Sequence, residues 1–158
     1  MRMQECAIVL AKGGFFSYNT EYIKGETKWR RTGMENENQT LTGRVVYGKQ
    51  LGRTLGFPTA NMDVENMEKC PMGVYAGLCR LDGTEYRVII NIGKHPTAPE
   101  GAPTVEAHLL DFSGDLYGRE ISVRLVKYLR GEVKFPSLDA LREQLTRDMN
   151  EARQAEIG

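Results

Sequence analysis

Residues 73–91 of the chain read G-V-Y-A-G-L-C-R-L-D-G-T-E-Y-R-V-I-I-N. Two runs rich in β-branched and aromatic residues, Gly73–Leu81 and Glu85–Asn91, flank the pair Asp82-Gly83. Such a pair between apolar runs is a strong signal for a β-hairpin, because aspartate and glycine tolerate the positive φ that a tight turn requires. The centre of the chain is therefore predicted to be an antiparallel hairpin.

Further short strands are predicted on both sides of this hairpin. Thr42–Tyr47 carries β-forming residues, Thr104–Leu110 alternates apolar and polar residues, and Glu120–Leu129 alternates with one slip. Several short strands separated by glycine and proline turns favour a barrel or a sandwich over a parallel α/β sheet. After the last strand, Ser137 is placed to cap a helix in which apolar residues recur every three or four positions from Leu138. We expect this helix to lean on a mainly β barrel.

Residues 1–40 differ from the rest of the chain. They show few clean periodicities and become polar and acidic over Met34–Thr40, a composition that favours weak structure without a packed core. We expect a weakly structured N-terminal arm or extension over residues 1–40 and the compact domain over 41–158. In a second interpretation Met34 is the native start, which N-terminal sequencing of the natively expressed protein would test.

The charge and composition of the chain argue against two classes of function, nucleic-acid binding and membrane association. The chain has 158 residues with 21 basic and 21 acidic side chains, so its formal net charge is zero. Non-specific nucleic-acid binding needs a basic surface, so we expect no nucleic-acid partner. No apolar run approaches the roughly 20 residues that span a bilayer, and no secretory leader is evident. We expect a cytoplasmic monomer with no membrane association.

The most informative loop is G-R-T-L-G-F-P-T-A-N, Gly52–Asn61. It is not a Walker A loop, because Arg53 stands where lysine belongs and no helix start follows, and it lacks the Rossmann glycine spacing. Glycines and Arg53 suit phosphate oxygens, while the Thr59 hydroxyl and the Asn61 amide oxygen suit Mg²⁺. Two interpretations remain open: a nucleotide-phosphate and metal site, or a turn whose Thr59 and Asn61 side chains satisfy local hydrogen bonds.

Three further segments carry candidate chemistry, each with a structural alternative. Glu106 shares a strand face with His108, and is either a general base facing a pocket or a charge on the barrel exterior. The turn Asp111–Gly118 is either the wall of a binding site or an ordinary exposed connection. Arg130 and Phe135, between the last strand and the helix, either grip a planar ligand or seal the helix–barrel junction.

In order and spacing, these segments resemble the riboflavin kinase family, the flavokinases. The resemblance covers about residues 41–155. It rests on the runs G-R-V-V-Y-G, G-R-T-L-G-F-P-T-A-N, G-V-Y-A-G, N-I-G-K-H-P-T, V-E-A-H-L-L-D-F, G-D-L-Y-G and L-R-G-E-V-K-F-P-S-L-D-A-L. The P-T-A-N run followed by the E-x-H-x-x-D-F run forms its most specific signature.

The resemblance implies a fold and an activity. The fold is a six-stranded antiparallel Greek-key β-barrel with a C-terminal helix. The activity is Mg²⁺-assisted transfer of a phosphoryl group from ATP to the 5′-hydroxyl of riboflavin, giving FMN and ADP. This chain would then be a monofunctional kinase or the kinase module of a bifunctional FAD synthetase. Because only about 40 weakly structured residues precede the matching region, we expect no complete adenylyltransferase half in this chain.

Two alternatives stay open beside this function. One is a kinase module that works with a separate FMN adenylyltransferase, and the other is a non-catalytic flavin-binding barrel for storage or sensing. An RNA-binding barrel is the weakest alternative, because it would need a basic surface with stacking aromatic residues.

By position, the resemblance also implies roles for individual residues. These are Glu106 as the catalytic base; Thr59 and Asn61 at the magnesium and phosphates; Gly48 and Arg53 in the phosphate-binding loop; Leu109, Asp111 and Tyr117 along the nucleotide; and Arg130, Phe135 and Leu138 beside the flavin.

Overall fold

The computed structural model describes residues 6–11, 14–23, 26–31, 39–48, 51–65, 70–94 and 103–156. The chain divides into two compact units, Met1–Glu37 and Asn38–Gly158. In the first unit, three strands form an antiparallel sheet in the order β1-β2-β3: β1 (Cys6–Ala11), β2 (Gly14–Ile23) and β3 (Glu26–Arg31). No strand is predicted in this region from the sequence. The weakly structured arm stays a prediction, and Met34 lies outside the described residues.

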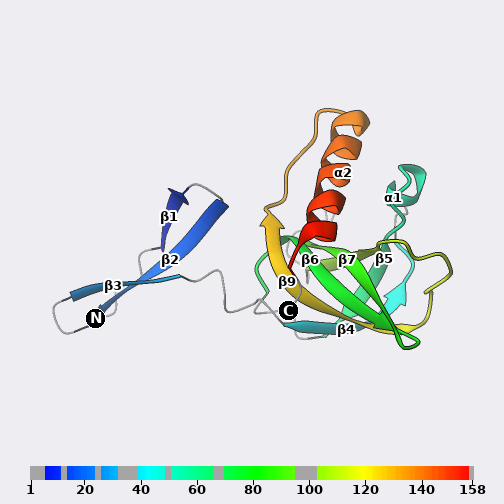
Figure 1. Ribbon diagram of the computed structural model, residues 1–158, viewed down its shortest axis with the longest axis horizontal. Helices are drawn as coiled ribbons and strands as arrows, with labels where there is room; N and C mark the ends of the chain where they lie inside the picture. Colours follow the sequence, from blue (N-terminus) through cyan, green and yellow to red (C-terminus); the bar gives the residue numbers. More distant parts are fainter. Residues whose placement is uncertain are drawn as a thin grey trace. The chain divides into compact units, whose positions relative to one another are not determined.

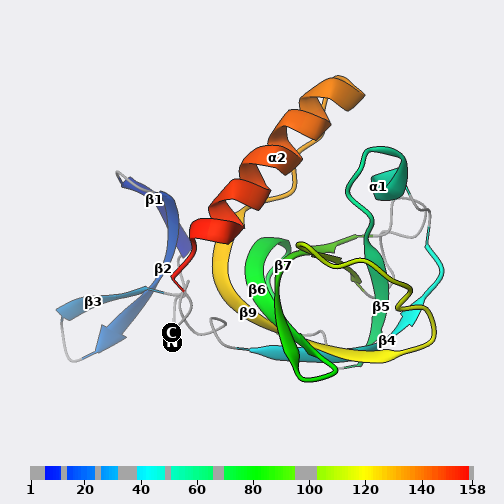
Figure 2. The ribbon, with the colours of Figure 1, turned by 45° about the vertical axis from the view of Figure 1, so that its right-hand side comes forward.

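The second unit is a closed barrel of six antiparallel strands (Figures 1 and 2). The strands are β4 (Thr40–Val46), β5 (Ala60–Val64), β6 (Gly73–Leu81), β7 (Thr84–Gly93), β8 (Thr104–Leu109) and β9 (Glu120–Arg130). Around the barrel their order is β4-β5-β8-β7-β6-β9. Strands β6, β7 and β8 follow one another, and β9 then returns beside β6, which is the Greek-key arrangement. The predicted six-stranded antiparallel barrel with a C-terminal helix is confirmed.

The central hairpin and the slip in the last strand are both present. Asp82 and Gly83 form the turn between β6 and β7 with φ values of 51° and 81°. On β9 the slip corresponds to a shift of register, because Ala76 pairs with Lys127 while the next residue of β6, Gly77, pairs with Leu125. One extra residue on a strand bends it and increases its twist, which helps β9 to close the barrel.

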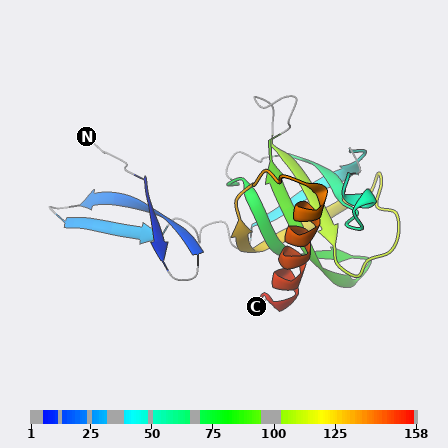
Figure 3. The same ribbon diagram turned by 90° about the horizontal axis from the view of Figure 1, so that it is seen from above.

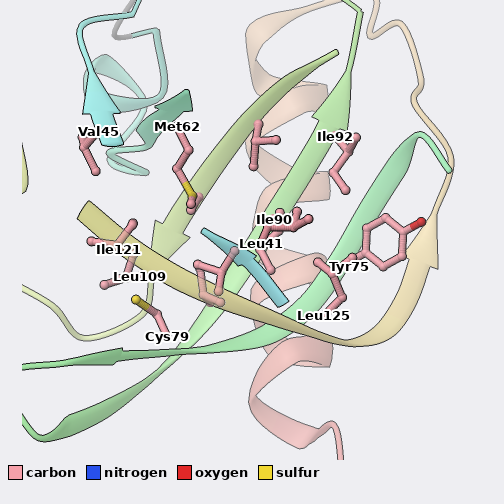
Figure 4. Close-up of a cluster of buried hydrophobic side chains, with 14 of the residues drawn as sticks. Leu41, Val45, Met62, Tyr75, Cys79, Ile90, Ile92, Leu109, Ile121 and Leu125 are labelled. Carbon is pink, nitrogen blue, oxygen red and sulfur yellow. The ribbon is translucent and has the colours of Figure 1, made fainter. Parts of the chain in front are cut away.

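Alternation along the strands separates the barrel interior from its outer face. On β8, Val105, Ala107 and Leu109 are buried inside, whereas Glu106 and His108 are half-buried on the other face. Burial of each aliphatic side chain stabilises the fold by roughly 1.5–3 kcal/mol. Figure 4 shows part of this interior cluster, which includes Leu41, Val45, Met62, Tyr75, Cys79, Ile90, Ile92, Ile121 and Leu125.

Helix α2 (Leu138–Gln154) contacts β6 and β7 on their outer face (Figure 3). As predicted, Ser137 is its N-cap, and its side-chain oxygen accepts a hydrogen bond from the Ala140 N–H at 3.1 Å. At the other end, the Arg87 guanidinium of β7 donates to the carbonyls of Ala152 and Ala155, both at 2.9 Å. A cation is favourable there because the last carbonyls of a helix lack partners within the helix.

The described helices include none that is long and apolar enough to cross a membrane.

Candidate active site

The glycine-rich loop folds into a compact turn that places Thr59 directly before β5. Helix α1 (Leu51–Thr54) begins the turn. The Gly52 carbonyl accepts hydrogen bonds from the N–H groups of Leu55 at 3.1 Å and Phe57 at 2.8 Å. A Cβ on Gly52 would collide with the Phe57 carbonyl, and Gly56 has a φ of 84°. Both glycines are thus required by the geometry of the turn itself.

His108 fixes this turn to the barrel. Its Nδ1 lies 2.7 Å from the Pro58 carbonyl oxygen. Because a carbonyl can only accept, Nδ1 carries the proton in this bond. The imidazole also meets the Phe57 ring edge-on, with centroids 5.8 Å apart. The histidine that shares a face with Glu106 therefore orients the residue next to Thr59.

A first pocket, which we call the polar pocket, has a volume of about 690 Å³. It lies between the end of β4, the segment from Arg53 to Asn61, and the connection from Phe112 to Tyr117. Several residues with an expected nucleotide or metal role line it, namely Gly48, Arg53, Thr59, Asn61, Leu109 and Tyr117. At its border the exposed rings of Tyr47 and Tyr117 stack with centroids 3.6 Å apart.

The side chains of Thr59 and Asn61, the two residues expected to bind Mg²⁺, both line the polar pocket. Both side chains are half-buried, and the Asn61 amide occupies the space that a Cβ on Gly48 would need. The described residues hold no group of three His, Cys, Asp or Glu side chains arranged for a metal. Mg²⁺ commonly takes only one or two protein oxygens beside phosphate oxygens and water. The two neutral oxygens therefore suit a cation that arrives with a nucleotide.

Asp111 does not line the polar pocket. Its carboxylate instead accepts two hydrogen bonds from the Arg153 guanidinium of α2, at 2.7 and 2.9 Å. The hydrogen bond from Arg153 holds the pKa of Asp111 below its ordinary value. Its expected place along the nucleotide stays a prediction.

A second pocket, the apolar pocket, has a volume of about 480 Å³ and lies on the outer face of the barrel beside α2. Eight apolar side chains line it: Leu55, Phe57, Val74, Ile89, Val133, Phe135, Leu141 and Leu145. Of the three residues expected beside the flavin, Arg130 and Phe135 line this pocket. Leu138 is 57% exposed and does not, whereas Leu141 and Leu145, one and two turns further along α2, do.

Glu106 lies where residues of the two pockets meet. In the strand register it is opposite Asn61 of β5 on one side and Asn91 of β7 on the other. Directly opposite residues share a face of the sheet, so these three side chains form a row on the outer face. Asn61 lines the polar pocket, Glu106 and Asn91 line the apolar pocket, and Thr59 lines both.

The Arg130 side chain joins the pocket wall to the helix. Its Nη2 lies 2.7 Å from Oδ2 of Asp148, and its Nε lies 3.0 and 3.1 Å from the two carboxylate oxygens. The guanidinium carbon also lies 5.8 Å from the centroid of the Phe135 ring. Arg130 thus seals the helix–barrel junction and lines the apolar pocket at the same time.

The geometry can be compared with known proteins. The family model of flavokinases, described as riboflavin kinase, matches residues 35–156. This chain belongs to the riboflavin kinase family. The resemblance on which the sequence analysis relied is therefore confirmed.

Individual relatives agree with this assignment. The bifunctional riboflavin kinase/FMN adenylyltransferase of Escherichia coli K12 is 44% identical over 72% of this chain and 37% of its own length. The RNA-binding riboflavin kinase RibR of Bacillus subtilis is 39% identical over 70% of this chain and 48% of its own. A crystal structure of riboflavin kinase from Trypanosoma brucei superposes with a TM-score of 0.55 and 27% identity, covering 73% of this chain and 77% of that one. The chain thus spans 37% of the bifunctional relative's length.

Several residues that line these pockets, or that support them, were not predicted from the sequence. Asn91 interrupts the apolar run Val88–Ile92, and a polar residue in such a run was the available signal. Leu141 and Leu145 belong to the apolar face predicted for the helix, but the pattern alone does not indicate which residues of that face line a pocket. Asp148 gave no signal, because its partner Arg130 is distant in the sequence and the two meet only after folding.

Proposed function

We propose that this chain transfers the γ-phosphoryl group of ATP to the 5′-hydroxyl of riboflavin, giving FMN and ADP. The observation that carries the proposal is the contact between the two pockets at Thr59, which lines both. A triphosphate in the polar pocket and a flavin in the apolar pocket would have their reacting groups near this residue. The apolar pocket, at about 480 Å³, is within the range of roughly 300–1,000 Å³ of small-molecule sites.

The polar pocket suits the phosphate end of ATP. Phosphoryl transfer needs positioning and charge neutralisation more than covalent participation of the protein. The permanently charged, exposed guanidinium of Arg53 would attract the phosphates. Thr59 and Asn61 would hold Mg²⁺, which supplies charge neutralisation for the phosphate oxygens when it is bound. The exposed Tyr47–Tyr117 stack would offer an aromatic surface to the base.

The apolar pocket suits a flavin. Its aliphatic and aromatic walls would bury a flat ring system, with Phe135 and the Arg130 guanidinium at one wall. Glu106 is half-buried on the same face. As general base, its carboxylate would accept the proton of the attacking hydroxyl as the new phosphorus–oxygen bond forms, which typically contributes about 10²–10⁴-fold in rate.

The test is incubation of the protein with riboflavin, Mg²⁺ and ATP, followed by chromatographic separation of FMN from FAD. FMN with matching ADP supports the proposal, and FAD as an additional product would indicate an adenylyltransferase activity as well. Tight riboflavin binding without FMN would favour a flavin-binding barrel. Absence of both binding and turnover would refute the proposal.

We further expect a cytoplasmic monomer. We also expect no affinity for nucleic acid, because the acidic and basic side chains balance at 21 each. The description of the Bacillus subtilis relative as RNA-binding concerns that protein. Gel filtration would test the monomeric state of this chain, and a gel shift with single-stranded RNA at low salt would test its lack of affinity for nucleic acid.

A further inference from the structure

One buried polar atom beside the apolar pocket has no hydrogen-bond partner among the residues that the structure describes. Among the side chains that the structure describes, Oδ1 of Asn91 is the one buried oxygen or nitrogen without a hydrogen bond. Such orphans are rare in folded proteins, because each loses its bonds to water without replacement. An orphan that persists next to a ligand pocket indicates a group that the ligand satisfies.

The position of Asn91 on β7 explains why its side chain lies in the wall of the apolar pocket. It follows Ile90 and precedes Ile92, and both are fully buried in the barrel interior. Alternation therefore turns the Asn91 side chain to the outer face, where it lines the apolar pocket. An apolar residue would fit the surrounding wall at lower cost, so an asparagine there is unfavourable for the free protein.

Two of the polar side chains that line this pocket, His108 and Arg130, already have other partners. His108 binds the Pro58 carbonyl, and Arg130 binds Asp148. Glu106, directly opposite Asn91 on β8, has an acceptor carboxylate when it is ionised, so it offers no proton to the Asn91 oxygen. A molecule bound in the apolar pocket can therefore supply the donor for Oδ1. The terminal torsion of asparagine is soft, so the amide can rotate to present Oδ1 to a bound molecule.

We infer that Asn91 is a substrate-binding residue whose side-chain oxygen accepts a hydrogen bond from a hydroxyl of the polyol chain of the flavin. This inference rests on the proposed function. It assigns Asn91 to the polyol chain, the part of riboflavin that joins the flavin ring to the reacting hydroxyl. A polyol is the matching chemical class, because one of its hydroxyls can donate a hydrogen bond to Asn91 while another donates to the carboxylate of Glu106 on the neighbouring strand. Asn91 would hold the chain so that its terminal hydroxyl reaches Glu106.

The experiment compares riboflavin with lumiflavin, which has the same ring system but no polyol chain. Dissociation constants of both are measured by fluorescence quenching for the wild type, Asn91→Leu, Asn91→Ala and the exposed-surface control Asn150→Ala. We expect Asn91→Leu and Asn91→Ala to weaken riboflavin binding about tenfold, equivalent to about 1.4 kcal/mol. Lumiflavin binding should stay unchanged, and Asn150→Ala should change neither.

Thermal unfolding of the free proteins separates binding from folding. Because Asn91→Leu removes an unsatisfied amide oxygen, its melting temperature should equal or exceed that of the wild type. Should the leucine variant not fold, the smaller alanine variant carries the same comparison. Unchanged riboflavin affinity, or an equal loss for both flavins, would overturn the role of Asn91 while leaving the kinase proposal intact. A wild type that binds no riboflavin would overturn both.

Discussion

Arg130 at the end of β9 and Asp148 on α2 form a salt bridge in which the carboxylate is almost completely shielded from water. The Arg130 side chain is 20% exposed and that of Asp148 only 2%. Gln144 adds a further hydrogen bond to the same carboxylate at 2.8 Å. This pair ties the helix to the barrel beside the apolar pocket, so its removal should affect both stability and the pocket.

We expect Arg130→Met to lower the free energy of unfolding by about 3–5 kcal/mol, because it leaves the buried Asp148 carboxylate without its counter-charge. Urea denaturation followed by circular dichroism measures the change. Arg142→Met is the matched control, since Arg142 pairs with Asp139 in a largely exposed ion pair of the same helix. It should change stability by no more than about 0.5 kcal/mol. Equal effects of the two substitutions would contradict the importance of the buried pair.

Glu106→Gln should keep riboflavin affinity and lose at least roughly 10²-fold in turnover, because the amide cannot accept the proton of the attacking hydroxyl. Initial rates of FMN formation, together with riboflavin titrations, separate the two quantities. Glu120→Gln, an exposed glutamate at the start of β9, serves as control and should retain the wild-type rate. Near-normal turnover of Glu106→Gln would refute the role as general base.

Thr59→Ala should raise the KM for Mg·ATP much more than it weakens riboflavin binding, since it removes one of the two proposed oxygen ligands. Thr59→Ser keeps the hydroxyl and should restore most of the lost affinity. Titrations of Mg²⁺ at fixed ATP provide the measurement. If alanine and serine behaved alike, or if Mg²⁺ dependence were unchanged, the hydroxyl would have no such role.

Gly48→Ala should also impair use of Mg·ATP, because the added Cβ would overlap the Asn61 side-chain amide. The KM for Mg·ATP is expected to rise while riboflavin affinity stays close to the wild-type value. Gly131→Ala is a suitable control, because a Cβ there would meet only the Tyr128 hydroxyl at 3.5 Å, an ordinary contact. A Gly48→Ala protein with unaltered kinetics would show that Asn61 can move without consequence.

The ion pair between Asp111 and Arg153 predicts a pH-dependent contribution to stability. Arg153 lowers the pKa of Asp111 from 3.8. A carboxyl whose pKa is lowered by folding adds stability above its unfolded pKa, and that stability is lost as the pH falls through the folded pKa. Arg153→Gln should therefore lower the melting temperature slightly near neutral pH and hardly at all once the pH lies below the lowered pKa of Asp111. The pair is exposed, so the effect should be small and should fade in 1 M salt. A difference that persists at low pH would exclude this origin.

The sequence predicted those elements whose signal is local. The Asp82-Gly83 turn, the alternation of β8 and the Ser137 cap each depend on a few neighbouring residues, and each is present. No strand was predicted at the position of β5, because Pro58 and the short run Ala60–Val64 leave little periodicity to detect.

Residues of the candidate site could be predicted where they stand in a sequence motif. They could not be predicted where only folding brings them next to their partners. Thr59, Asn61 and Glu106 stand in recognisable runs, and the structure brings them to adjoining pockets. Asn91 and Asp148 acquire their significance from Glu106 and Arg130, their partners across the fold. Leu138 and Asp111 occupy motif positions, yet their side chains lie outside the pockets because the helix rotation and the Arg153 contact determine where they point.

The pairing of the first barrel strand with the last has a consequence for how the protein folds during synthesis. Where β4 pairs with β9, the hydroxyl oxygens of Thr42 and Ser122 lie 2.7 Å apart in a hydrogen bond, although the two residues are 80 positions apart in the chain. Contacts between such distant residues form slowly, because a long loop must close before they are gained. Until the ribosome has released β9, strand β4 has an unpaired edge that can associate with other chains. Expression at lower temperature or with chaperones should therefore raise the yield of folded protein more than substitutions near the pockets would.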